Sequence, residues 1–89
     1  MIRVLVIDDS LFIRTVVQDM LSDDPDIQIV GVASDGLEAL DKIRELKPDL
    51  ITLDIEMPRL DGLSMLERKK EIDRFPKTLV LSSLTSEGA

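Results

Sequence analysis

The chain contains no cysteine and no histidine among its 89 residues, and these two absences remove several kinds of chemistry. Disulfides, thiol catalysis and thiolate metal sites all require cysteine. A serine–histidine–aspartate triad requires histidine, so this chain cannot build one. Any metal ion would have to be held by oxygen ligands, which suits hard cations.

Aromatic residues and positive charge are also scarce. The only aromatics are Phe12 and Phe75, and 11 lysines and arginines stand against 18 aspartates and glutamates. The net charge is therefore −7 and the pI is about 4.4. Nucleic-acid-binding surfaces cluster positive charge and stack bases on aromatic rings. We therefore expect no direct contact with nucleic acid.

Long apolar runs are missing as well, since none approaches the roughly 18 residues that a membrane span needs. The first residues lead directly into a strand-like run, so no signal peptide is visible. Hydrophobic residues still make up 44% of the chain, which supports one small packed domain. We expect a single domain over residues 1–89, located in the cytoplasm and without membrane contact.

Apolar patterning alternates between strand and helix along the chain. Short β-branched apolar runs predict strands over residues 4–7, 27–33, 49–54 and 77–82. Helical spacing predicts helices over residues 11–21, 36–46 and 62–72. Their expected inner faces are Ile13, Val16, Val17, Met20 and Leu21, then Leu37, Leu40, Ile43 and Leu46, then Leu63 and Leu66. Helices between successive strands predict an α/β fold with a doubly wound parallel sheet.

Three carboxylates follow predicted strands, at the edge of the sheet where doubly wound folds bind ligands. Asp8 and Asp9 follow the first strand, and Asp54 ends the third. A single aspartate at such a position is ordinarily a turn or cap residue. Three of them at two strand ends would repel one another without a counter-charge, which favours a site for Mg²⁺.

A carboxylate beside a bound cation can attack phosphorus and form an aspartyl phosphate. Asp54 is the better candidate nucleophile because it stands alone at its strand end, whereas Asp8 and Asp9 form a pair suited to the cation. Two other hypotheses stay open. One is a phosphatase or phosphotransferase that uses Asp54 as nucleophile and Glu56 as acid, and the other is an interaction module without phosphotransfer.

These motifs resemble the receiver domain of response regulators. The resemblance covers the whole chain and is carried by residues 4–10, Val-Leu-Val-Ile-Asp-Asp-Ser, and by the pattern Asp-x-x-Met-Pro-x-x-Asp-Gly over residues 54–62. It implies the flavodoxin-like, CheY-like fold with strand order 2-1-3-4-5. A complete receiver has a fifth strand that ends in a lysine, and this chain stops before one. We therefore expect an incomplete receiver with strand order 2-1-3-4.

The resemblance also implies a role for each candidate residue. Asp54 would accept a phosphoryl group from a sensor histidine kinase. Asp9 would bind Mg²⁺ directly, Asp8 mainly through water, and Glu56 through its backbone carbonyl. Ser82, at the end of the fourth strand, would follow the phosphoryl group as the switch hydroxyl.

A narrower resemblance is to receivers of the chemotaxis protein-glutamate methylesterase family, carried by residues 54–63 and 81–89. In that family the receiver regulates a C-terminal domain that demethylates, and can deamidate, chemoreceptors. No such domain is present in this chain. Without a fifth strand, residues 78–82 would form an exposed edge, with Leu79 and Leu81 on uncovered sides of the sheet. We expect such an edge to promote self-association.

Overall fold

The computed structural model describes residues 1–54 and 62–81, except for the side chains of residues 62 and 63. Strands and helices alternate along the chain. Their bounds are β1 Ile2–Ile7, α1 Leu11–Ser22, β2 Ile27–Ala33, α2 Gly36–Leu46, β3 Leu50–Asp54, α3 Gly62–Glu67, a 3₁₀ helix Lys69–Glu71 and β4 Lys77–Leu81. No helix in these described residues is both long and apolar enough to cross a membrane.

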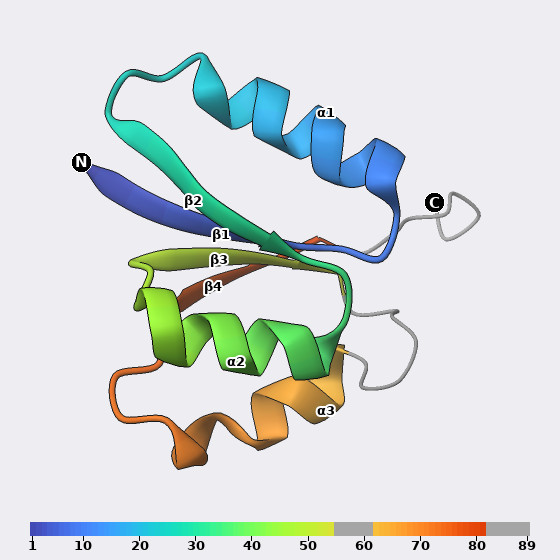
Figure 1. Cartoon of the computed structure of the whole chain (residues 1–89), viewed down its shortest axis with the longest axis vertical. Coiled ribbons are helices and arrows are strands. Elements are labelled where there is room, and N and C mark those ends of the chain that lie inside the picture. Colours follow the sequence, from blue (N-terminus) through green and yellow to red (C-terminus); the bar gives the residue numbers. More distant parts are fainter. Residues whose placement is uncertain (55–61, 82–89) are drawn as a thin grey trace.

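The four strands form one parallel sheet in the order β2-β1-β3-β4. Helix α1 lies on one face of this sheet, and α2 and α3 lie on the other (Figure 1). The predicted doubly wound α/β fold with strand order 2-1-3-4 is therefore confirmed. Because β1 and β3 are neighbours and Ile7 pairs with Leu53, their carboxyl ends lie side by side.

Side-chain caps start the first two helices. The Ser10 hydroxyl accepts a hydrogen bond from the Ile13 N–H at 3.2 Å, and the Asp35 carboxylate accepts one from the Glu38 N–H at 2.9 Å. The Glu38 carboxylate reaches back and accepts from the N–H and hydroxyl of Ser34, at 2.8 and 2.9 Å. This reciprocal arrangement works like a capping box. The Ser34 N–H is the main reason that the pKa of Glu38 lies below its usual value.

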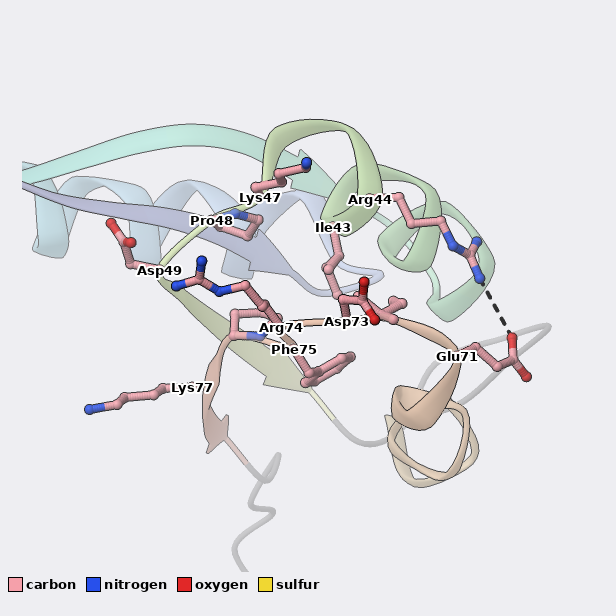
Figure 2. A pocket seen from close by; sticks show the side chains of 12 residues that line it. Ile43, Arg44, Lys47, Pro48, Asp49, Glu71, Asp73, Arg74, Phe75 and Lys77 are labelled. Carbon is pink, nitrogen blue, oxygen red and sulfur yellow. Dashed lines mark ion pairs between the residues drawn. The ribbon is translucent and has the colours of Figure 1, made fainter.

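Helix α2 ends where the sequence predicts, at Lys47 and Pro48 (Figure 2). Lys47 adopts the left-handed conformation, with φ 48° and ψ 60°, and its N–H donates to the Ile43 carbonyl at 3.0 Å. A residue before proline avoids the right-handed helical region, so the helix cannot continue. The Arg3 guanidinium donates to the Lys47 carbonyl at 2.8 Å and thereby ties this end of α2 to β1.

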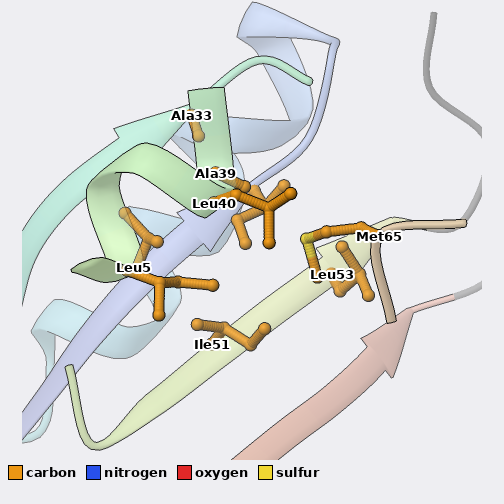
Figure 3. Close-up of a cluster of buried hydrophobic side chains, with 9 residues drawn as sticks. Leu5, Ala33, Ala39, Leu40, Ile51, Leu53 and Met65 are labelled. Carbon is orange, nitrogen blue, oxygen red and sulfur yellow. The ribbon is translucent and has the colours of Figure 1, made fainter. Parts of the chain in front are cut away.

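The main core lies between the sheet and helices α2 and α3 (Figure 3). Alternate residues of β1 and β3 point to this face, as the pleat of a strand requires. Its buried members are Leu5, Ile7, Ala33, Ala39, Leu40, Ile43, Ile51, Leu53 and Met65. Leu46, Leu66, Ile72 and Phe75 are partly buried against them.

One predicted inner residue of α2 is wrong. Leu37 is 41% exposed, whereas Leu40 and Ile43 are buried as expected. The buried stripe begins at Gly36 and continues through Ala39, so Leu37 is rotated about 100° away from it. Spacing alone selected the larger apolar side chain, but the small residues Gly36 and Ala39 are the buried ones.

The predicted inner face of α1 is also wrong in part. No side chain of α1 is fully buried, and Ile13, Val16 and Met20 are exposed, while Val17 and Leu21 are partly buried. Among the described residues, α1 is the only helix on its face of the sheet (Figure 1). Helix α1 covers the centre of that face, and no other helix of the described residues packs beside it.

The third helix is shorter than predicted. It ends at Glu67, and the 3₁₀ helix Lys69–Glu71 follows in place of a continuous helix to residue 72. Fading apolar periodicity accompanies this change. The Arg68 guanidinium donates to both Glu71 carboxylate oxygens at 3.2 Å and so supports the tighter turn.

The edge strand also differs in detail from the expectation. Leu79 and Val80 of β4 are 50% and 45% exposed, whereas Leu81 is only partly exposed. Leu79 pairs with Thr52 and Val80 pairs with Leu53, so the two exposed side chains lie on opposite faces of the sheet. Leu79 is thus exposed as expected, Leu81 is partly covered, and Val80 is exposed on the opposite face.

The contrast between Leu40 and Leu37 gives a matched test of this packing. We expect Leu40→Ala to lower the free energy of unfolding by about 2–5 kcal/mol, because it opens a cavity in the core. Leu37→Ala makes the same chemical change at an exposed position of the same helix and should stay within about 1 kcal/mol of the parent. Urea unfolding of both variants measures the difference. Equal losses would place Leu37 in the core and contradict this description of α2.

Candidate functional site

Three aspartates meet at the carboxyl edge of the sheet. Asp8 follows β1, and Asp54 is the last residue of the neighbouring strand β3. Each of Asp8, Asp9 and Asp54 offers one carboxylate oxygen, and these oxygens all lie within 4.8 Å of one another. Asp8 and Asp54 are buried, at 4% and 7% exposure, while Asp9 is exposed. The predicted convergence of the three side chains is therefore present.

Asp8 is held by bonds from three directions. Its N–H donates to the Ala33 carbonyl of β2 at 3.0 Å, and its carboxylate accepts from the Ser10 N–H at 2.9 Å. Its own carbonyl accepts a 2.7 Å hydrogen bond from the Arg14 guanidinium. These contacts fix the backbone just before Asp9, and they link the acidic cluster to β2 and to the first turn of α1.

Arg14 is the part of this site that sequence reasoning missed. Its position one turn after the Ser10 cap is the only signal in the sequence, and a charged residue there reads as part of a solvated helix face. The guanidinium instead turns back over the end of β1. Its positive charge lies close enough to Asp8 to act on that carboxylate.

Burial makes the cluster electrostatically unfavourable. The pKa of Asp8 is raised above its usual value, mainly because burial removes water from the carboxylate, and the charge of Asp9 adds to this effect. The Ser10 N–H and the Arg14 charge act in the opposite direction without cancelling it. A cation among the three carboxylates would relieve this repulsion, because an opposite charge favours the ionised form.

Two of the predicted site residues, Glu56 and Ser82, lie outside the described residues. The sequence indicates a loop over residues 55–61, around Pro58, and this segment also lies outside the described residues. The roles of Glu56 as a carbonyl ligand and of Ser82 as a switch hydroxyl stay predictions.

Domains with a doubly wound sheet bind their ligands at the carboxyl edge of that sheet. This chain belongs to that class, and its three aspartates lie at this edge, at the junction of β1 and β3. Comparison of the sequence with known families agrees with this class. Residues 4–88 match the response regulator receiver domain. The chain belongs to this family, as the resemblance in its sequence predicts.

Two individual relatives show which members of the family this chain is similar to. Over 90 residues the chain is 52% identical to a protein-glutamate methylesterase/protein-glutamine glutaminase of Lawsonia intracellularis, a match that covers 100% of this chain and 25% of that protein. The crystal structure of the response regulator domain of Thermotoga maritima CheB is 51% identical, with a TM-score of 0.87, over 99% of this chain and 65% of that one. The chain thus spans about a quarter of the curated relative that it matches.

A third relative comes from a complex. A chain in the crystal structure of the P1 domain of CheA3 with CheY6 from R. sphaeroides is 37% identical. Its TM-score is 0.79, over 99% of this chain and 68% of that chain.

The raised pKa of Asp8 gives a test of the cluster without any ligand. A raised folded-state pKa means that the folded protein holds its proton more tightly than the unfolded chain does, so Asp8 favours folding at low pH. This contribution is lost as the pH rises from below 3.8 through the raised value. We therefore expect Asp8→Asn to increase the free energy of unfolding at pH 7 in the absence of divalent cations, and to do so less near pH 3. Asp41→Asn, on an exposed face of α2, is the control. A loss of stability at pH 7 in Asp8→Asn alone would contradict the electrostatic description.

Proposed function

We propose that this chain is a phosphorylatable receiver of a chemotaxis two-component system and that Asp54 accepts the phosphoryl group from a sensor histidine kinase. The convergence of Asp8, Asp9 and Asp54 at the carboxyl edge carries the proposal. Membership of the receiver family supports it, as does the likeness to a complex that contains a CheA P1 domain and a CheY protein.

The donor set fits Mg²⁺, which prefers oxygen ligands and keeps several waters. Asp9 and Asp54 would hold the ion with their carboxylates and Glu56 with its carbonyl, while Asp8 would act mainly through water. Bound Mg²⁺ neutralises charge on a transferring phosphoryl group. Asp9 is exposed, whereas Asp8 and Asp54 are buried.

Asp54, Asp8 and Ser82 have different roles in the proposed phosphoryl transfer. A carboxylate oxygen of Asp54 attacks phosphorus, the bond from phosphorus to the kinase imidazole breaks, and an acyl phosphate forms on Asp54. The contacts of Asp8 with Ala33, Ser10 and Arg14 keep its carboxylate in place during this step. Ser82 is proposed as the hydroxyl that responds to the new phosphoryl group.

The output of the switch is inferred from the relatives. Similarity to protein-glutamate methylesterases supports a role in regulating a methylesterase and glutaminase domain that acts on chemoreceptors in a longer cytoplasmic protein. Residues 1–89 would be part of its receiver, since they correspond to 65% of the solved CheB domain. No contact in the described residues favours an independent phosphatase.

Phosphorylation by a small donor tests the proposal. With acetyl phosphate and Mg²⁺, the longer protein that contains this chain should gain one alkali-labile phosphoryl group, which intact-mass spectrometry detects. Asp54→Asn should lose it, and Asp9→Asn should need far more Mg²⁺ to reach the same level. Asp49→Asn, an exposed aspartate at the opposite edge of the sheet, should behave like the parent. Labelling that persists in Asp54→Asn would show that another residue is the acceptor.

We also propose that the 89-residue chain by itself self-associates through β4. This strand is at the edge of the described sheet, and its Leu79 and Val80 are half exposed. Unpaired strand edges and large apolar patches both promote association.

Sedimentation velocity at micromolar concentration measures this association. The parent chain should sediment as a dimer or larger species, and Leu79→Lys should shift it toward the monomer because a charge on an edge strand opposes pairing. Leu37→Lys places the same charge at an exposed leucine of α2 and should leave the distribution unchanged. A monomeric parent chain would refute the association.

A further inference from the structure

A groove lies at the edge of the sheet opposite the aspartate cluster. It is lined by the end of α2, the residues just before β3 and the segment from Glu71 to Lys77 (Figure 2). Its volume of about 720 Å³ is in the range of ligand-binding pockets. Pro48 and Asp49 precede β3, while Asp54 ends it, so the length of a strand separates the groove from the cluster. We call it the amino-edge groove.

The inner part of the amino-edge groove is apolar. Ile43, Pro48 and Pro76 are buried, while Ile72 and Phe75 are partly buried and pack against the core. Phe75 is one of only two aromatic residues in the chain. An apolar side chain of a ligand would therefore meet a surface that the core already holds in place.

The rim of the groove carries cationic side chains that have no bonding partner among the described residues. Lys47, Arg74 and Lys77 line it, and within the described residues their side chains take part in no ion pair or hydrogen bond. Figure 2 shows the side chains of Arg74 and Lys77 extending to the same side of the groove.

The other charges of the groove are mostly engaged. Arg44 pairs with Glu71 at 3.5 Å, and Glu71 also binds Arg68. The Asp49 carboxylate accepts a 2.9 Å hydrogen bond from the Arg3 N–H. Asp73 has no partner among the described residues. The lining residues comprise four cations, Arg44, Lys47, Arg74 and Lys77, and three carboxylates, Asp49, Glu71 and Asp73. The groove therefore has a net charge of +1 in a chain whose net charge is −7.

We propose that the amino-edge groove binds an acidic segment of a partner protein, with an apolar residue between its carboxylates. The carboxylates meet Lys47, Arg74 and Lys77, and the apolar side chain rests against Ile72 and Phe75. The free cations come from three places, the α2 cap, the turn before β4 and β4 itself. This spacing suits carboxylates distributed along a peptide better than a single phosphate, which takes a convergent set of donors. None of Asp8, Asp9 and Asp54 lines this groove.

Fluorescence anisotropy with labelled model peptides tests the proposal on the full chain. The probe is a short peptide of glutamates around one leucine, and its controls replace the glutamates by lysines or the leucine by serine. We expect the first peptide to bind and both controls to bind at least about tenfold more weakly. Raising the salt from about 50 to about 200 mM should weaken binding, because the rim charges are exposed.

Charge reversals locate the bound peptide. Arg74→Glu and Lys77→Glu should each lower the affinity about tenfold. Lys70→Glu makes the same charge change in the same segment, but Lys70 does not line the groove and the affinity should change little. Melting curves show that each variant is folded, which is expected because all three side chains are exposed.

Several results would overturn the proposal. They are a failure of the parent chain to bind the acidic peptide, equal binding of the serine control, and equal weakening by Lys70→Glu. Displacement of the peptide by inorganic phosphate at constant ionic strength would show a small-anion site and would equally refute peptide recognition.

Discussion

The parallel pairing of β1 with β3 is the constraint on which the site depends. It aligns Ile7 with Leu53 and so places the next residue of each strand, Asp8 and Asp54, side by side. The fold thus brings two buried carboxylates together, with Asp9 beside them. The pKa of Asp8 is raised, mainly by burial and further by the charge of Asp9. Such a cluster of carboxylates attracts a cation, and the cation in turn attracts a phosphoryl group.

The fold and the cluster were predictable because both depend on short-range patterns. Strands buried on both faces appear as continuous apolar runs, and helix-length segments between them leave parallel pairing as the simple solution. Asp8 and Asp54 then follow directly from strand ends. Arg14 was harder to predict. Its guanidinium donates a hydrogen bond to the backbone carbonyl of Asp8, and no spacing rule describes such a contact.

The errors in the predicted core have a common cause. Periodicity identifies a face of a helix, but it does not show which part of that face meets the sheet. In α2 the small residues Gly36 and Ala39 lie against the sheet, so Leu37 turns outward. Met65 is fully buried although the sequence predicts only Leu63 and Leu66 on the inner face of its helix, because a six-residue helix gives little periodic signal. Tertiary contact decided these positions.

The two faces of the sheet are packed to different degrees. The acidic site depends on contacts from the less tightly packed face, which is covered by α1. The face under α2 and α3 holds the buried cluster that includes Leu40 and Met65. On the α1 face, Thr52 has a buried hydroxyl without a hydrogen-bond partner in the described residues, and its neighbour Leu79 is half exposed. Layers with few buried apolar contacts open at lower free energy than the core.

Helix α1 carries both Ser10 at its cap and Arg14 in its first turn, and these residues hold Asp8. A change in how α1 packs would therefore be transmitted to the acidic cluster through two hydrogen bonds, without any change in the α2 and α3 core. The same bonds act in the other direction, because a cation that fixes the Asp8 carboxylate would also restrain the start of α1. Coupling between two positions through shared contacts is reciprocal in free energy. Helix α1, which has no fully buried side chain, is thus the helix that is hydrogen-bonded to the site.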